Sequence, residues 1–275
     1  MKKLLNTPLV LLVLTGMLVA SCDFNDDPSE PNYTIVEEDA EASIVFEDLD
    51  NLTLKVLSNS GLSARTAVDI PTGSICESAV ITIDEESKKI TVDFGEGCTN
   101  SNGVTRKGII NLTYTAHLLF PGAKIITTFD GYEVDGKKVE GTRTITNKEV
   151  DIETNAITLE VTIQNGKVTW ADGSSVTVSS EQLRKINLGT QGNYEVSITG
   201  SASGTSRSGL DYTSSVTEAL IYTRSCLETG VSTPLSGIVS FQFNEIEASV
   251  DYGDGTCDKM ATVFYPTGSK QVTLD

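Results

Sequence analysis

The sequence contains one histidine, His117, and one tryptophan, Trp170, among 275 residues. Zinc enzymes usually hold their metal through several imidazoles, so a single histidine argues against a zinc hydrolase. A serine hydrolase would have to build its triad around His117, and the chain has no Gly-x-Ser-x-Gly nucleophile elbow. We therefore predict no catalytic residue and no cofactor, and we interpret His117 as a polar-face residue of a strand.

Basic side chains are also scarce: 20 Lys and Arg stand against 38 Asp and Glu, which gives a net charge of −18. Nucleic-acid binding needs a basic footprint, so this charge excludes a nucleic-acid partner. It also argues against adhesion to anionic lipid headgroups by charge alone. The acids are concentrated near the N-terminus, where Asp23 to Asp50 hold eleven Asp and Glu and no Lys or Arg.

No apolar run is long enough to cross a membrane. The longest, Leu9 to Ala20, has 12 residues and is interrupted by Thr15 and Gly16, whereas a transmembrane helix needs about 20. Lysines precede this run and small residues, Val19-Ala20-Ser21, follow it. These are the parts of a secretory signal peptide, which we predict over residues 1–21.

The residue after this cut is Cys22, and its position resembles the lipobox of bacterial lipoproteins. The resemblance implies that Cys22 becomes the first mature residue and carries acyl chains, so the protein would meet the membrane through its N-terminal lipid. Residues 22–36 would form an acidic tether, whose start resembles the surface-export signal of Bacteroidota lipoproteins. A solvated, disordered linker explains the same acidic, proline-bearing composition, and both interpretations can hold together.

Four cysteines remain: Cys76, Cys98, Cys226 and Cys257. An even number in an exported chain predicts disulfides. Three pairings are possible, and an internal echo favours one, because Asp93-Phe94-Gly95-Glu96-Gly97-Cys98 is repeated as Asp251-Tyr252-Gly253-Asp254-Gly255-Thr256-Cys257. We predict Cys76–Cys98 and Cys226–Cys257. A four-cysteine zinc site is the rival, and it usually shows closely spaced cysteine pairs that are missing here.

From Cys76 onward the chain alternates apolar and polar residues, as half-buried strands do. The patterns cover residues 81–83, 110–120, 157–163 and 196–198. Turn dipeptides that favour hairpins separate the apolar runs: Asn102-Gly103, Pro121-Gly122, Asp130-Gly131, Asp135-Gly136, Asn165-Gly166, Asp172-Gly173 and Ser208-Gly209.

The predicted fold is therefore all-β: an antiparallel meander of ten or more strands, forming a sandwich-like or strongly curled sheet over residues 37–275. One N-terminal helix is expected over residues 37–60, because Val45, Leu49, Leu52 and Val56 share a helical face. We expect it to pack on an edge or open end of the sheet. The echo also suggests an internal duplication of residues 76–147 and 226–275.

The sequence offers three kinds of candidate site. Trp170 and Tyr132, with Phe129, would supply a stacking platform for a glycan, although a lone tryptophan commonly packs in a core. Asp251, Asp254 and Asp258 would supply oxygen ligands for calcium, although their motif is also that of a structural turn. The stretch from Asp251 to Thr256 resembles the turn of polycystic-kidney-disease-type β-sandwich modules. Paired carboxylates would serve a glycoside hydrolase, but 38 acids make chance pairs common.

The lipobox, the acidic tether, the two Asp-aromatic-Gly-acidic-Gly motifs, Gly103-Val104-Thr105-Arg106-Lys107-Gly108 and Val139-Glu140-Gly141-Thr142-Arg143-Thr144 together resemble uncharacterised Bacteroidota outer-membrane lipoproteins. The resemblance implies a lipid-anchored outer-membrane protein facing the cell exterior and supplies no reaction. Our hypothesis is a non-enzymatic structural or interaction module. The alternatives are a glycan-binding module using Trp170 and Tyr132, and a carboxylate-dependent glycoside hydrolase. The sequence does not identify a protein or glycan partner.

Overall fold

The structure is a computed structural model that describes residues 34–59, 75–229, 231 and 233–274. The predicted signal peptide 1–21, the lipidation site Cys22 and all but the last three residues of the tether 22–36 lie outside this part of the chain. Where the structure describes it, the chain has a long first helix, α1 (Thr34–Asn59), a short helix, α2 (Arg224–Leu227), and a single turn of 3₁₀ helix (Thr190–Gly192).

Between and after these helices the chain forms fourteen strands. Their bounds are β1 Val80–Asp84, β2 Lys89–Asp93, β3 Cys98–Thr99, β4 Thr105–Tyr114, β5 Lys124–Val134, β6 Lys137–Asp151, β7 Ala156–Thr169, β8 Ser175–Leu188, β9 Tyr194–Thr205, β10 Asp211–Thr223, β11 Ser236–Phe243, β12 Ile246–Asp254, β13 Met260–Tyr265 and β14 Gly268–Thr273.

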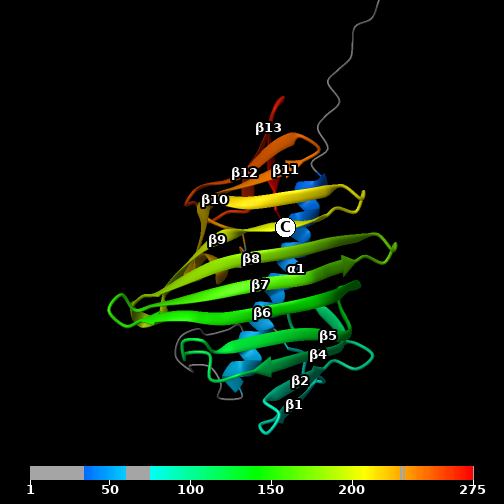
Figure 1. Cartoon of the computed structure of the whole chain (residues 1–275), viewed down its shortest axis with the longest axis vertical. Helices are drawn as coiled ribbons and strands as arrows, with labels where there is room; N and C mark the ends of the chain where they lie inside the picture. The colour runs from blue at the N-terminus through cyan, green and yellow to red at the C-terminus, as the bar shows by residue number, and fades with distance from the viewer. Residues whose placement is uncertain (1–33, 60–74, 230, 232, 275) are drawn as a thin grey trace, which may run out of the picture. The chain divides into compact units, whose positions relative to one another are not determined.

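All fourteen strands belong to one antiparallel sheet, and each pairs with its neighbours in the sequence, apart from the short β3, which pairs only with β4 (Figure 1). The all-β meander with one N-terminal helix is thus confirmed. The sandwich-like or strongly curled form is wrong, because the sheet is single, open and neither closed nor strongly curled. The apolar face that a second sheet would cover is covered by α1 instead.

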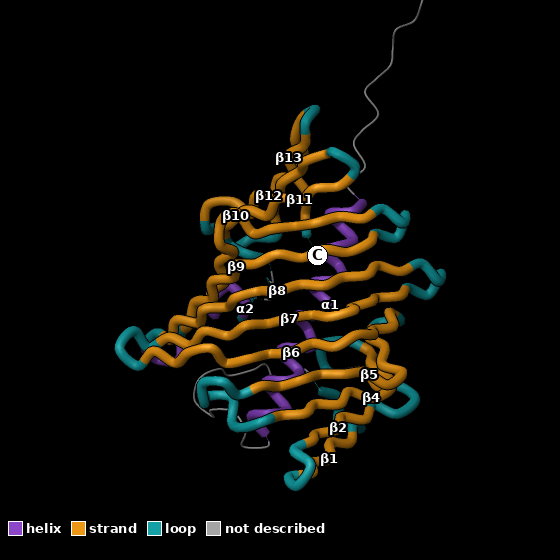
Figure 2. Tube along the Cα trace, viewed as in Figure 1, coloured by secondary structure: helices purple, strands orange, loops and turns teal. Residues whose placement is uncertain are grey.

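Helix α1 runs across the strands on one face of the sheet, here called the inner face (Figure 2). Its predicted apolar stripe, Val45, Leu49, Leu52 and Val56, is buried in a core shared with strands β2 to β8. The helix begins three residues before the predicted start and ends one residue before the predicted end. Our expectation that it packs on an edge or open end is wrong, because this stripe needs the broad apolar face of the central strands.

The acids of α1 also attach it to the sheet. Seven of the eleven acidic residues between Asp23 and Asp50 lie in this helix. Asp48 binds the buried Arg106 of β4, with Oδ1 2.6 Å from Nη2, and the carboxylate of Glu47 lies 3.8 Å from Arg184 of β8. These seven acids all lie within the predicted helix rather than the predicted tether, and two of them help to dock the helix on the sheet.

Two of the seven turn dipeptides lie inside strands. Asp130-Gly131 is in β5 and Asn165-Gly166 is in β7, and both coincide with irregularities in strand register. Asn165 has a φ of 52°, so the positive φ that such pairs favour is used in a β-bulge rather than a hairpin. The backbones approach closely here, because a Cβ on Gly108 would lie 2.2 Å from the carbonyl oxygen of Gly131.

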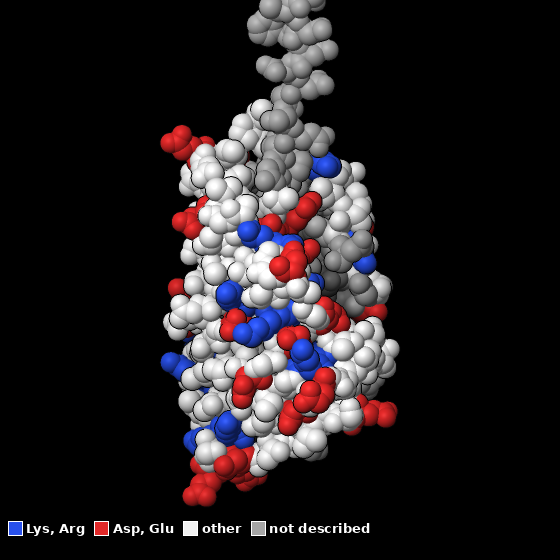
Figure 3. Space-filling view, turned by 90° about the vertical axis from the view of Figure 1, so that its right-hand side faces the viewer, with Lys and Arg blue, Asp and Glu red and all other residues white. Residues whose placement is uncertain are grey.

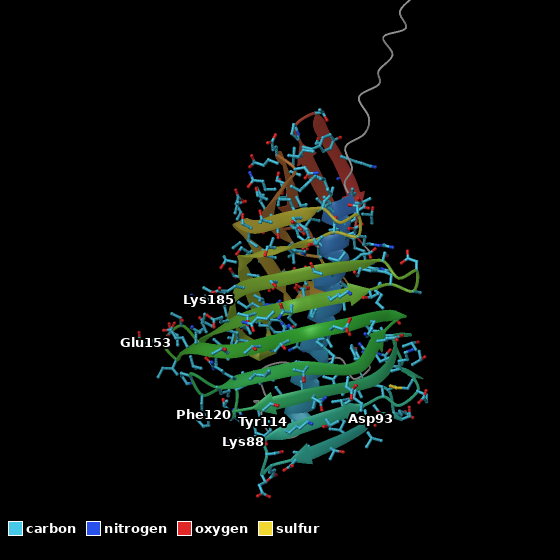
Figure 4. The ribbon with its side chains drawn as sticks, turned by 45° about the vertical axis from the view of Figure 1, so that its right-hand side comes forward. Lys88, Asp93, Tyr114, Phe120, Glu153 and Lys185 are labelled. Carbon is cyan, nitrogen blue, oxygen red and sulfur yellow. A yellow bond between two sulfur atoms is a disulfide. The ribbon has the colours of Figure 1, made fainter. Side chains whose placement is uncertain are left out.

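The long strand predicted over residues 110–120 ends at Tyr114. Figure 4 shows Phe120 in the loop beyond this end, and that side chain is 63% exposed. His117 lies in the same loop, where its Nδ1 accepts a hydrogen bond from the Leu119 backbone N–H at 3.2 Å. Its predicted place on a strand face is therefore wrong. The apolar alternation continues past Tyr114, since Leu118 is buried, but the strand pairing does not.

The two disulfides have the predicted pairing. Cys76–Cys98 joins Cα atoms 6.1 Å apart, and Cys226–Cys257 joins Cα atoms 5.6 Å apart. The echoed motifs also share a turn, because the carboxylates of Asp93 and Asp251 each accept a hydrogen bond at 2.8 Å from the N–H two residues ahead. This common geometry accounts for the repeated residues; the internal duplication stays a hypothesis.

Candidate ligand-binding cavity

A cavity of about 380 Å³ lies between the first half of α1 and the inner face of the sheet. The helix contributes residues between Val36 and Glu47, and the sheet contributes side chains from β6 to β14. The cavity also lies where the apolar core divides, since one buried cluster surrounds the later residues of α1 and a second surrounds Ile35 and Val36.

The floor of the cavity is open because its side chains are small. Strand register places Ser180, Ala202 and Ser214 in one row across β8, β9 and β10, between the larger Ile163 and Phe241. Gly200, which also lines the cavity, contributes no side chain. The helix residues that line the cavity include the equally small Ala40 and Ser43. Small residues on both layers therefore leave space that larger ones would fill.

The cavity walls are mainly aliphatic, and their apolar members come from both layers. They are Val36, Ile44 and Phe46 of α1 with Ile163, Val178, Val216, Leu220, Val239, Phe241, Val250, Val263 and Val272 of the sheet. Glu37, Glu41, Ile44 and Thr273 are exposed and lie at the rim. The cavity is thus mainly apolar inside, and its edge beside the helix is acidic and exposed to solvent.

Asp39 is the carboxylate buried in this lining. It is 8% exposed, and the hydroxyl of Tyr212 on β10 donates a hydrogen bond to its Oδ1 at 2.6 Å. Burial raises the pKa of Asp39 from 3.8 to about 6, although the Tyr212 hydrogen bond opposes the shift. The pKa of Tyr212 is also raised, by burial and by the nearby Asp39 charge. This pair fastens the N-terminal half of α1 to the sheet.

We expect Asp39→Asn to remove a pH dependence of stability. Because the pKa of Asp39 is about 6 in the folded protein and about 3.9 in an unfolded chain, the folded state binds the proton more tightly. The free energy of unfolding should therefore fall by about 2 kcal/mol as the pH rises from 4 to 7 on account of this group. Urea denaturation at both pH values would measure this effect. The stability of Asp39→Asn relative to the natural protein should be higher at pH 7 than at pH 4.

Glu41→Gln is the matched control for Asp39→Asn, because Glu41 is exposed on the same helix. It should leave the difference in stability between pH 4 and pH 7 unchanged. An equal difference for the natural protein and Asp39→Asn would contradict the assignment.

A second polar group lines the cavity near β8. Arg184 donates to the Gln182 side chain at 2.7 Å and lies beside Glu47 of α1, and the buried Tyr222 lies on the same wall. Burial raises the pKa of Tyr222 well above its ordinary value, so it stays a neutral hydroxyl. Arg143 of β6 also lines the cavity and is 1% exposed. These groups add a few polar atoms to an otherwise mainly aliphatic lining.

The structure does not form the predicted aromatic platform. Tyr132 is fully buried, with its ring centroid 5.7 Å from Phe129 and 5.9 Å from Phe94, so it has no face for a sugar. The ring of Trp170 is half-buried under Arg207, whose guanidinium carbon lies 4.6 Å from the ring centroid. Core packing and a cation–π contact occupy these rings, which argues against the predicted glycan site at Trp170 and Tyr132.

The opposite face of the sheet, its outer face, carries a polar hollow of about 720 Å³ across β7 to β12. Hydroxyl and amide side chains line it, among them Thr162, Gln164, Ser179, Ser203 and Gln242. A polar ligand here would meet hydroxyls and amides rather than the aromatic rings that the sequence suggests.

The three candidate calcium ligands each serve their own turn. Asp251 accepts a hydrogen bond from the Gly253 N–H, Asp254 from the Thr256 hydroxyl and Asp258 from the Met260 N–H, at 2.8 to 3.0 Å. Among the described residues, no group of three or more His, Cys, Asp or Glu is placed to hold a metal ion. The contacts therefore favour the structural interpretation of this motif.

Besides the exposed Glu37 and Glu41 at its rim, the cavity is lined by two further carboxylates, those of Asp39 and Glu47. They lie eight residues apart on one helix, so their Cα atoms are about 12 Å apart along its axis. Glycosidase carboxyl pairs lie about 5–10 Å apart, and each of these acids already has a partner on the sheet. The arrangement therefore favours binding over hydrolysis.

Comparisons with protein families, with curated proteins and with solved structures found no match to this chain. Within the described part of the chain, no helix combines the length and the apolar character that crossing a membrane requires. The cavity itself was missed by sequence reasoning. A usable signal was the run of small residues at inner-face positions of β8 to β10, where Ser180, Ala202 and Ser214 stand in place of Val, Ile or Leu.

Proposed function

We propose that this chain is an exported, lipid-anchored and non-enzymatic interaction module of the outer membrane, facing the cell exterior, and that it binds a small apolar molecule between α1 and the sheet. The observation that carries the binding activity is the 380 Å³ cavity with aliphatic walls. Ligand sites typically have volumes of about 300–1,000 Å³, apolar walls and a few polar groups with perturbed pKa values. Asp39 and Tyr222 supply such groups here.

Export is supported by the N-terminal sequence and by the two disulfides, since disulfides persist in oxidising compartments. The surface is compatible with an exposed, soluble domain. On the face that Figure 3 shows, basic and acidic side chains are intermixed rather than separated into regions of one sign.

A neutral fluorescent probe, N-phenyl-1-naphthylamine, tests the binding site directly. We expect its emission to rise and shift to the blue with the natural protein, because the cavity removes it from water. Ala202→Leu places three further carbons on the cavity floor and should weaken probe binding at least tenfold, measured by fluorescence titration.

Ser203→Leu is the matched control, since the neighbouring Ser203 is exposed and lines the outer hollow. Circular dichroism and thermal unfolding would establish that both variants fold. Equal probe affinity for Ala202→Leu and the natural protein would exclude the cavity as the binding site.

A further inference from the structure

The chemistry of the cavity walls restricts what they bind. Ten of the apolar wall residues are Val, Ile or Leu on the sheet and helix, and the two phenylalanines, Phe46 and Phe241, are themselves buried core residues. Walls of branched aliphatic side chains make an irregular space without a flat slot. Such a space accommodates a flexible aliphatic chain, which can follow its irregular outline.

The volume sets a length for such a chain. An apolar cavity of about 150 Å³ holds benzene, which has six carbons, so about 25 Å³ is needed per carbon. By this measure the 380 Å³ cavity holds a chain of about 15 carbons. This is the range of the acyl chains of membrane lipids.

The position of the cavity agrees with a supply from the membrane. The first half of α1 lines it, and α1 begins at Thr34, only twelve residues after Cys22. A fully extended chain spans at most about 3.6 Å per residue, so the tether reaches about 40 Å. A lipid on Cys22 would therefore keep the cavity within that distance of a bilayer. Ile44, which is 46% exposed at the rim, adds apolar surface at the cavity edge.

We infer that the cavity holds one acyl chain of a lipid taken from the membrane to which the protein is tethered. The inference rests on the proposed function and names its ligand class. The head group would remain outside, next to Glu37 and Glu41, so a zwitterionic or neutral head group is preferred over an anionic one.

A chain-length series tests this inference. Lysophosphatidylcholines with 10, 12, 14, 16 and 18 carbons would be titrated calorimetrically, below their micelle concentrations, into the full-length Cys22→Ala variant. Affinity should rise about fourfold per methylene while the chain enters the cavity, and the rise should stop at roughly 15 carbons. Ala202→Leu should reduce the chain length at which affinity stops rising, and Ser203→Leu should leave that length unchanged.

The outcomes separate the two proposals. If N-phenyl-1-naphthylamine binds but lysophosphatidylcholine affinity does not depend on chain length, the acyl inference fails and the apolar binding site stands. If neither the probe nor any lipid binds, both fail. If the Cys22→Ala variant binds the lipids and the lipidated protein does not, the occupant is the protein's own acyl chain, which overturns the membrane source.

Discussion

Replacing Cys22 by Ala is expected to move essentially all of the protein from the membrane fraction to the soluble fraction. Each buried acyl methylene contributes about 0.8 kcal/mol to membrane binding, so two long chains hold a protein firmly and their loss abolishes anchoring. The described residues contain no helix that would replace the anchor. Cell fractionation followed by immunoblotting would measure the shift, and labelled palmitate should enter the natural protein but not the variant.

Ser21→Ala is the appropriate control, because it keeps a small residue before the predicted cut and leaves Cys22 in place. It should retain the palmitate label and the membrane location. If Cys22→Ala protein stayed in the membrane fraction, or if palmitate still labelled it, the lipoprotein assignment and the membrane supply of ligand would both be rejected.

Asp48→Ala should lower the free energy of unfolding by about 3 kcal/mol. Removing one partner of a buried ion pair costs about 3–5 kcal/mol because the other charge remains buried without compensation. The guanidinium of Arg106 is 1% exposed and Asp48 is 30% exposed, so the lower end of this range applies. Arg106 lies under α1, so in the variant its charge has to be accommodated inside the protein. Urea denaturation with the disulfides intact would measure the loss of stability.

Two further variants make this test specific. Glu140→Ala breaks the exposed Lys138–Glu140 pair and should change stability by less than about 1 kcal/mol. The double variant Asp48→Leu with Arg106→Met replaces both charges by apolar groups and should recover most of the stability. A loss below 1 kcal/mol for Asp48→Ala would show that the pair does not hold α1 in place.

The meander could be predicted because its signals are local. Alternation such as that of Ile157 to Ile163 and turns such as Asp135-Gly136 depend on neighbouring residues alone, and the structure confirms both. The disulfide pairing could be predicted for a similar reason, since the two echoed turns each end in a cysteine. The role of a turn dipeptide also depends on the partner strand, because a positive φ occurs in a β-bulge as well as in a hairpin turn. For this reason Asn165-Gly166 was wrongly predicted to be a hairpin turn and is part of a bulge.

The cavity was not predicted, because it depends on register between strands that lie far apart in the sequence. Ser180, Ala202 and Ser214 are unremarkable as single residues, and only the pairing of β8, β9 and β10 aligns them. The same applies to Asp39 and Tyr212, which are 173 positions apart in the sequence. The acids of α1 look like part of a solvated segment until the arginines of β4 and β8 are placed opposite them.

The order of the strands has a consequence for how the protein folds. Each long strand pairs with the strand that follows it in the sequence, so the sheet can grow one hairpin at a time as the polypeptide emerges. Helix α1 emerges first, yet the side chains that bind it come from β4 through β10. The apolar stripe of α1 can therefore dock once β8 is present, but the Asp39–Tyr212 contact must wait until β10 has been added. The loop that this last contact closes is the longest of the three, so its closure costs the most chain entropy.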